Sequence, residues 1–158
     1  LFLLQTRTAK RAPEAAVRMA VEMAGDGLIS IDEALARVTP DLVRVMLRPS
    51  LVPGAADALT PLVTGEVACQ GVCLGTVVID PDEAEPRARE GEAVVLARPT
   101  TSPEDVHGMI PAKAIITEKG GSTSHSAVVS RALGLPCVVG CGEGKVVALA
   151  GRQVTVCG

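Results

Sequence analysis

Apolar residues in the first part of the chain recur at the spacing of an α-helix. Ala16, Ala20 and Met23 lie three or four positions apart, so they would share one face of a helix. This helix is predicted to start near Pro13, a residue that suits the first turn, and to end near Gly25.

Two shorter helices are predicted after this one. Ser30 and Glu33 have the spacing of a capping box, and Thr39 followed by Pro40 is a common helix start. Short helices with few bulky side chains bury little surface by themselves. We therefore expect residues 1–64 to form a small helical appendage that packs on another part of a larger protein, with a Pro- and Gly-rich linker at its end.

From residue 65 the pattern changes to short β-branched runs separated by turn residues. Helical signals interrupt these runs at residues 102–109 and again from Ser124 to Leu133. Because strands outnumber helices and do not alternate regularly with them, we predict a small α+β domain over residues 65–158 and not a doubly wound sheet. The predicted strands lie in the segments GVCLGTVVID, AVVLA, AIIT, CVVG, KVVAL and QVTV.

The amino-acid composition argues against nucleic acids and membranes as partners. Of 158 residues 47% are hydrophobic, but there is no Trp or Tyr and a single Phe, Phe2, so the core must be aliphatic. A net charge of -3 and the lack of aromatic platforms argue against nucleic acid. There is no apolar run of membrane-spanning length and no signal peptide, so we expect a cytoplasmic protein away from membranes. Because the chain begins at Leu1, we expect it to be a piece of a longer one.

The cysteines form two C-x-x-x-C segments, Cys69 with Cys73 and Cys137 with Cys141, and Cys157 stands apart. Such pairs could each supply half of a zinc site. Four residues of extended strand separate two sulfurs by roughly 13 Å, however, which is too far to bind one ion. We therefore expect no metal site and reduced, mostly buried thiols.

The segment GGSTSH carries the candidate chemistry. Gly120 and Gly121 permit a tight turn between a strand and a helix, and either Thr123 or Ser124 would cap that helix. His125 then lies in the first helical turn, where free backbone amides and the helix dipole favour an anion and the neutral form of an imidazole. A neutral imidazole is a nucleophile, so His125 could carry a phosphoryl group. The alternative is an ordinary capping or surface histidine.

The rest of this helix is expected to pack on the core through four apolar residues. Ser130 is expected on a solvated face, and Arg131 is expected to be a surface residue and not a phosphate ligand. His107 is expected to face water, and the adjacent Glu104 and Asp105 to favour the dipole of a short helix. The expected apolar face consists of Val128, Val129, Ala132 and Leu133.

The stretch GGSTSHSAVVSRALGLPCVVGCG resembles the phosphohistidine motif of phosphoenolpyruvate (PEP)-utilising enzymes. LARPTTSPEDVHGM and LFLLQTRTAKR are most similar to the pyruvate, phosphate dikinases. The resemblance implies a swivelling β/β/α phosphohistidine domain. In that family an ATP-grasp domain phosphorylates the histidine from ATP, and a barrel domain passes the phosphoryl group to pyruvate to form PEP.

Carried over by position, the resemblance makes His125 the phosphorylated residue and Thr123 a regulatory residue for a kinase and phosphatase. A phosphate on Thr123 would repel an incoming phosphoryl group; the alternative is that Thr123 is an ordinary cap. Gln5 and Arg7 match nucleotide-binding residues that act only in the full-length enzyme. The residues expected to support the phosphate are Gly120, Gly121, Ser124 and Ser126.

Other functions stay open at this point. PEP synthase, the first enzyme of the sugar phosphotransferase system and an antibiotic phosphotransferase use a similar domain, and a non-catalytic interaction module is a further possibility. The resemblance implies ATP and Mg for the full-length enzyme and no cofactor in this fragment. The ATP-grasp and barrel domains would lie in the same chain or in a partner subunit.

Overall fold

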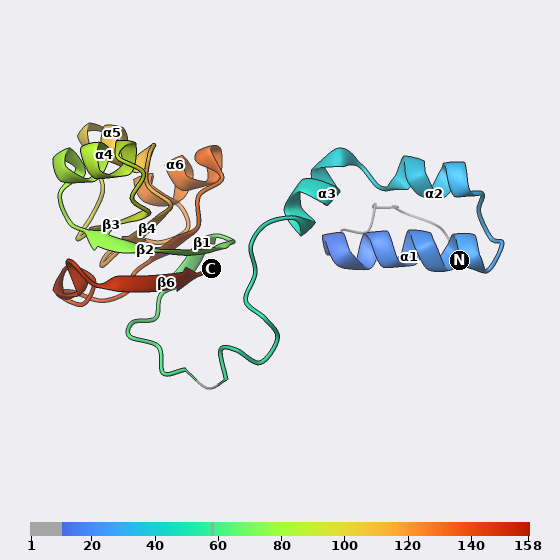
Figure 1. Cartoon of the computed structure of the whole chain (residues 1–158), viewed down its shortest axis with the longest axis horizontal. Coiled ribbons are helices and arrows are strands. Elements are labelled where there is room, and N and C mark those ends of the chain that lie inside the picture. The colour runs from blue at the N-terminus through green and yellow to red at the C-terminus, as the bar shows by residue number, and fades with distance from the viewer. Residues whose placement is uncertain (1–10, 58) are drawn as a thin grey trace, which may run out of the picture. The chain divides into compact units, whose positions relative to one another are not determined.

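The computed structural model describes residues 11–57 and 59–158. Contacts along the chain divide it into two compact units, the first ending at Arg48 and the second beginning at Pro49. Figure 1 shows the helices of the first unit and the sheet of the second. No helix in the described part of the chain has both the length and the apolar character needed to cross a membrane.

The first unit consists of three helices, α1 (Pro13–Gly25), α2 (Ile31–Arg37) and α3 (Pro40–Met46). All three agree with the sequence prediction. The capping box of α2 is formed, because Ser30 Oγ accepts from the Glu33 amide and a Glu33 carboxylate oxygen accepts from the Ser30 amide, both at 3.1 Å. Among residues 11–48 only Ala20 is buried.

The second unit is built on one six-stranded sheet with the strand order β1-β5-β4-β3-β2-β6. The four central strands are parallel to one another, and the two edge strands pair with them in antiparallel fashion. The strands are β1 (Glu66–Cys69), β2 (Val72–Val78), β3 (Val94–Arg98), β4 (Ala114–Thr117), β5 (Cys137–Val139) and β6 (Gln153–Cys157).

Helices alternate with the parallel strands. After β2 comes α4 (Pro81–Arg89), after β3 come the 3-10 turn η1 (Pro103–Asp105) and α5 (Val106–Met109), and after β4 comes α6 (His125–Leu133). Figure 1 shows α4, α5 and α6 on the same side of the sheet. The α+β class with a preceding helical segment is confirmed, and the sheet is not doubly wound, because that arrangement needs helices on both faces.

The expectation that helices and strands do not alternate is wrong. Its error lies in α4, whose sequence PDEAEPRAR has few apolar residues to produce a helical pattern. This helix is specified by its start, where the Asp80 carboxylate accepts from the Asp82 amide at 2.9 Å and Pro81 occupies the first turn.

The sequence analysis is also in error near the two ends of the domain, where it predicted one strand that does not form and missed another that does. The segment KVVAL does not form a strand; its last three residues form the 3-10 turn η2 (Val147–Leu149). Val146 and Leu149 are both buried, and a spacing of three places them on one side of such a turn. The short strand β1 was not predicted.

Two buried clusters fill the two faces of the sheet. The helix-side cluster includes Leu96, Met109 and Ala127, whereas the far-side cluster includes Val95 and Val146. Alternate residues of β3 contribute to opposite clusters, as expected for a strand covered on both faces.

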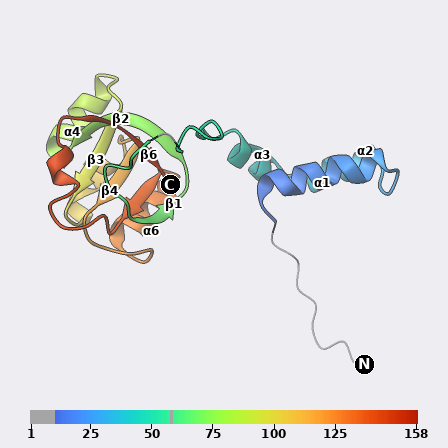
Figure 2. The same ribbon diagram turned by 90° about the horizontal axis from the view of Figure 1, so that it is seen from below.

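The sheet is curled, as Figure 2 shows from below. Its first and last strands therefore end close together. Gly158, directly after β6, exchanges two backbone hydrogen bonds with Gly71, which lies between β1 and β2, at 2.9 and 3.2 Å. This pair extends the β2–β6 ladder by one position. A Cβ atom at Gly158 would lie 2.9 Å from the Cys69 carbonyl oxygen, so the end of β6 also lies next to the end of β1.

Candidate functional site

The candidate histidine follows the carboxyl end of the parallel strand β4. The chain turns at Gly120, whose φ of +113° is unfavourable for any residue with a side chain. A Cβ atom at Gly120 would also lie 3.0 Å from the Cβ of Ser124. Gly121 has no positive φ, so of the two glycines only Gly120 is required by the backbone.

Helix α6 begins at His125, and Ser124 is its N-cap. The Ser124 Oγ accepts from the Ala127 amide at 3.4 Å and lies 3.0 Å from the Ser126 Oγ. The structure therefore gives the capping role to Ser124, while Thr123 is exposed and makes no cap. The two hydroxyls that flank His125 in the sequence hold each other in place.

The imidazole of His125 is only partly exposed, and its Nε2 atom is buried from solvent. This nitrogen has no hydrogen-bond partner among the described residues. A buried ring nitrogen without a partner loses hydration without compensation, so its presence in a native fold calls for an explanation. A role in binding or chemistry is one.

Glu104, in the turn η1 after β3, lies near His125. The pKa of Glu104 is lowered, first by a hydrogen bond from the Ser102 hydroxyl, then by its own backbone amide, and to a smaller extent by His125. Loops that follow neighbouring parallel strands thus converge beside the imidazole. In sheets of this kind the carboxyl ends of parallel strands are the usual place for a ligand.

The buried face of α6 differs from the predicted one. Val128 is 54% exposed and Leu133 is 42% exposed. Small residues face the sheet instead, which lets the helix approach β5 closely: Cys137 Sγ lies 4.0 Å from the Ser126 carbonyl oxygen. Ser130, expected on the solvated face, is fully buried, and in the described part of the chain its Oγ has no hydrogen-bond partner. The buried residues of α6 are Ser126, Ala127 and Ser130.

Arg131 has a structural role that the sequence did not indicate. Its guanidinium donates to the Ser122 carbonyl at 2.7 Å and to the Ala68 carbonyl at 3.2 Å. These bonds join the loop before His125 to strand β1. Arg131 is an exposed residue, as expected, but it holds the glycine turn in place.

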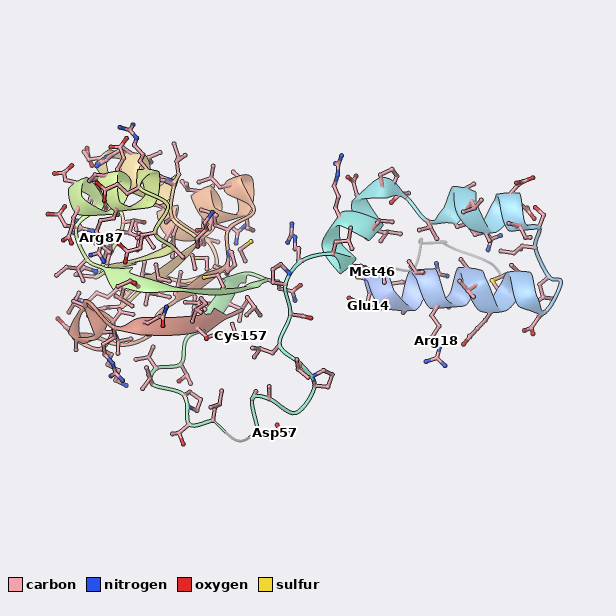
Figure 3. All side chains as sticks on the ribbon, in the orientation of Figure 1. Glu14, Arg18, Met46, Asp57, Arg87 and Cys157 are labelled. Carbon is pink, nitrogen blue, oxygen red and sulfur yellow. The ribbon has the colours of Figure 1, made fainter. Side chains whose placement is uncertain are left out.

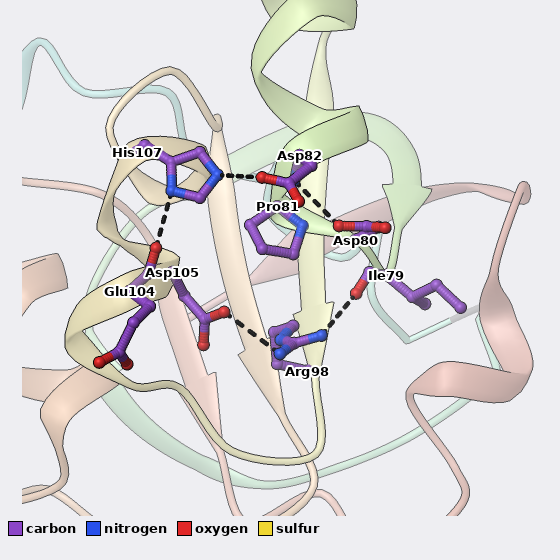
Figure 4. Close-up of a pocket in the computed structure, with 8 residues that line it drawn as sticks. All are labelled: Ile79, Asp80, Pro81, Asp82, Arg98, Glu104, Asp105 and His107. Carbon is purple, nitrogen blue, oxygen red and sulfur yellow. Dashed lines mark hydrogen bonds and ion pairs between the residues drawn. The ribbon is translucent and has the colours of Figure 1, made fainter.

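A pocket of about 470 Å³ lies at the carboxyl ends of β2 and β3 (Figure 4). Arg98 crosses its floor, donating to the Ile79 carbonyl at 3.1 Å and pairing with Asp105 at 3.2 Å. The adjacent acids Glu104 and Asp105, both expected only to favour the helix dipole, differ in burial. Asp105 is 4% exposed and pairs with Arg98, whereas Glu104 is exposed. The lining residues are Ile79, Asp80, Pro81, Asp82, Arg98, Glu104, Asp105 and His107.

His107 is partly exposed to water, as expected, but its ring also makes two contacts that the sequence did not indicate. Its Nδ1 lies 2.7 Å from the Glu104 carbonyl oxygen and its Nε2 lies 2.9 Å from an Asp82 carboxylate oxygen, so it bridges α5 and α4 (Figure 4). Both contacts, the backbone one first, raise the pKa of His107. Such a bridge between two helices depends on folding and cannot be seen in a local pattern.

Within the described ranges no three His, Cys, Asp or Glu side chains are placed to hold a metal ion. None of the five cysteines is in a disulfide. Gln5 and Arg7, predicted to bind nucleotide in the full-length enzyme, lie outside the described residues.

Residues 90–158 match the family model described as the mobile domain of PEP-utilising enzymes. The matched part of the mobile domain runs from the residues before β3 to the end of β6, and it contains the glycine turn, His125 and α6.

Similarity extends beyond the matched part of the mobile domain. The chain is 44% identical over 146 residues to pyruvate, phosphate dikinase of Rhizobium meliloti (strain 1021), covering 92% of this chain and 16% of that protein. Identity is 40% over 146 residues to the dikinase of Clostridium symbiosum, with 92% and 17% coverage. For pyruvate, phosphate dikinase 2 of Zea mays it is 42% over 141 residues, with 89% and 16% coverage.

The chain thus spans about a sixth of the length of these curated relatives. Among solved structures, an NMR solution structure of Enzyme I (nEIt) matches with 35% identity and a TM-score of 0.36. That match covers 42% of this chain and 27% of the other.

Proposed function

We propose that this chain is the phosphoryl-carrier domain of a pyruvate, phosphate dikinase-like phosphotransferase, with His125 as the carrier. The observation that carries the proposal is the state of His125 Nε2, which is buried at the start of α6 and has no hydrogen-bond partner within residues 11–57 and 59–158. A nitrogen held in this way keeps its lone pair free for a bond to phosphorus. The similarity to dikinases over nearly the whole chain supports the same reaction class.

The transfer would proceed in two balanced steps. The Nε2 lone pair of His125 attacks a phosphorus atom of the donor, the bond to the leaving oxygen breaks, and that oxygen takes the electron pair. In the second step an acceptor oxygen attacks the phosphohistidine and the N–P bond breaks, which restores the lone pair on Nε2. Because Nε2 is closed off from solvent here, the groups that cover it must move before either partner can reach it.

The start of α6 would stabilise the transferred group. Free backbone amides and the positive end of the helix dipole favour the negative charge of a phosphoryl group on the first residue of a helix. Gly120 and Gly121 leave room at the turn, and Ser124 would orient the amides as the cap. Ser126 is 2% exposed and 3.0 Å from the Ser124 hydroxyl, so we give it a positioning role through Ser124.

We further propose that Thr123 is a site of regulation by a kinase and a phosphatase. Its side chain is exposed and has no capping duty, so phosphorylation would not have to break the helix start. A phosphate two residues before His125 would place like charges together and oppose loading of the histidine. Thr123→Asp should therefore lower phosphorylation of His125, whereas Thr123→Val should leave it close to the original level.

The other components of the reaction are assigned to parts of the enzyme outside this chain. ATP and Mg would be bound by an ATP-grasp domain, and pyruvate by a barrel domain, in the same chain or in a partner subunit. The relatives are about six times longer than the aligned part, which leaves room for both. Gln5 and Arg7 would complete the nucleotide site of the ATP-grasp domain.

The test is to incubate the chain with radiolabelled ATP and the ATP-grasp part of a dikinase. We expect one label that is lost in acid and stable in base, as a phosphohistidine is. His125→Ala should abolish the label, and His107→Ala, the matched control at the other histidine, should retain it. A label that survives acid, or that persists in His125→Ala, would contradict the proposal.

A further inference from the structure

The two C-x-x-x-C segments meet across the sheet and not within themselves. Cys69 is the last residue of β1 and Cys137 is the first residue of β5, and their Cα atoms are partners in this antiparallel pair. Cys73 lies on β2, opposite Val156 of β6. The repeated spacing in the sequence thus brings one cysteine of each segment together.

The geometry of the Cys69–Cys137 pair suits a disulfide. Opposed residues in antiparallel strands have Cα atoms about 4.5–5.5 Å apart and side chains on one face. A disulfide needs a Cα separation of about 4.4–6.8 Å. The register shifts between Val67 and Cys69, and Cys69 joins Ala68 against the helix-side cluster that contains Cys137. Both sulfur atoms therefore belong to the same side of the sheet.

The thiols of Cys69 and Cys137 differ in their exposure to solvent. Cys69 is partly exposed, so a small oxidant in solution can reach it. Cys137 is fully buried, and burial raises the pKa of its thiol. Cys69 is thus suited to react first and Cys137 to react second, from inside.

The remaining cysteines have no such neighbour. Cys157 is opposite Val72, one position from the Cys73–Val156 pair, so Cys73 and Cys157 point to opposite faces. Cys73 and Cys141 belong to the far-side cluster, away from Cys137. Figure 3 shows the exposed Cys157 at the end of β6.

We propose that Cys69 and Cys137 form an oxidative modification site that takes a peroxide as co-substrate. The Cys69 thiolate attacks one peroxide oxygen, the O–O bond breaks, and Cys69 sulfenic acid and one water are formed. The Cys137 thiolate then attacks the Cys69 sulfur, the S–S bond forms, and the hydroxide leaves as a second water. Two thiols are oxidised by two electrons, and hydrogen peroxide is reduced to two waters.

The disulfide links β1 to β5 beneath α6. Cys137 Sγ is already 4.0 Å from the Ser126 carbonyl oxygen in the first turn of that helix. Oxidation therefore fixes an edge strand to the platform that supports His125. The chemistry of this pair is independent of whether His125 carries phosphate.

To test this, the 158-residue chain is treated with hydrogen peroxide under native conditions, its remaining thiols are alkylated in denaturant, and it is digested with trypsin without reduction. Fragmentation by mass spectrometry should identify a link between Cys69 and Cys137, with loss of two of the five thiols that dithiothreitol reverses. Raising the pH should speed the reaction, because more Cys137 becomes thiolate.

Cys73 shares a tryptic peptide with Cys69, and Cys141 shares one with Cys137, so a linked pair of peptides does not by itself identify the two cysteines. Single cysteine variants make that assignment. Cys69→Ser changes a partly exposed residue and should reduce the link at least tenfold, whereas Cys73→Ser, Cys141→Ser and Cys157→Ser should retain it. The proposal is overturned if the link joins any other pair, or if Cys69 is oxidised while Cys137 can still be alkylated.

Discussion

The two units of the chain are both rich in aliphatic residues but differ in what they bury. In the second unit nearly every residue of β3 and β4 is inaccessible to solvent, and the sheet is covered on both faces. In the described part of the first unit only Ala20 is buried. Hydrophobic residues such as Leu28 and Ile31 are 70% and 73% exposed there.

The difference shows that helical periodicity alone does not make a core. In the first unit α2 and α3 have side-chain caps, whereas α1 begins at a first-turn proline without one. Local ion pairs such as Arg18–Glu22 are exposed, and exposed pairs of this kind contribute only a few tenths of a kcal/mol each. The sheet unit gains its stability from long-range burial. The candidate site lies in the unit that can hold a side chain in a fixed position.

The sharpest test of this comparison is to replace one leucine in each unit by alanine. Leu96 of β3 is fully buried, so Leu96→Ala should cost about 2–5 kcal/mol of unfolding free energy. Leu28→Ala in the first unit should change it by less than about 0.5 kcal/mol. Urea unfolding followed by circular dichroism measures both, and equal losses would contradict the comparison.

Replacing one glycine in each unit by alanine tests the same difference in packing between the two units. A Cβ at Gly108 would lie 2.6 Å from the Cα of Pro81, because α5 touches the start of α4. Gly108→Ala should therefore lower the unfolding free energy by about 1–3 kcal/mol. Gly25→Ala, at the end of α1, meets no atom within 4 Å and should leave thermal unfolding of the sheet unit unchanged.

A smaller effect is expected at Ser130, the fully buried hydroxyl of α6. Its Oγ meets no hydrogen-bond partner among the described residues and has only the Cys137 thiol near it. Ser130→Ala should therefore leave stability unchanged or raise it by up to about 1 kcal/mol. Thermal unfolding measures the change. A loss of stability larger than about 1 kcal/mol would mean that the hydroxyl is hydrogen-bonded in solution.

The smallest effect is the pH dependence of the His107 bridge. Folding raises the pKa of His107. The bridge therefore stabilises the protein fully below the unfolded pKa of about 6.5, and this stabilisation is lost as the pH rises through the pKa of His107 in the folded protein. The Tm difference between the original protein and His107→Gln should be larger at about pH 5.5 than at about pH 8.5. An equal difference at both pH values would contradict the bridge.

The sequence predicted the features that depend on local signals. Caps at Ser30 and Thr39 located two helices, and the β-branched runs located most strands. The turn at Gly120 followed by a helix starting near His125 was also predictable, because a glycine, a serine cap and a helical pattern occur in succession.

What could not be predicted depends on contacts between distant segments. Helix α4 has little apolar pattern and is recognised only when Pro81 packs beneath α5. The inward face of α6 is set by the space available above β5, which favours Ser126 and Ser130 over the larger Val128. The His107 bridge likewise joins two helices 25 positions apart in the sequence.

The most direct measurement of the central claim is phosphorus NMR of the chain after reaction with phosphoramidate, a small donor that phosphorylates imidazoles. We predict one phosphohistidine, with phosphorus on Nε2 of His125, and loss of its signal in His125→Ala. A signal that comes only from His107, or a His125 that stays unmodified while His107 reacts, would contradict it.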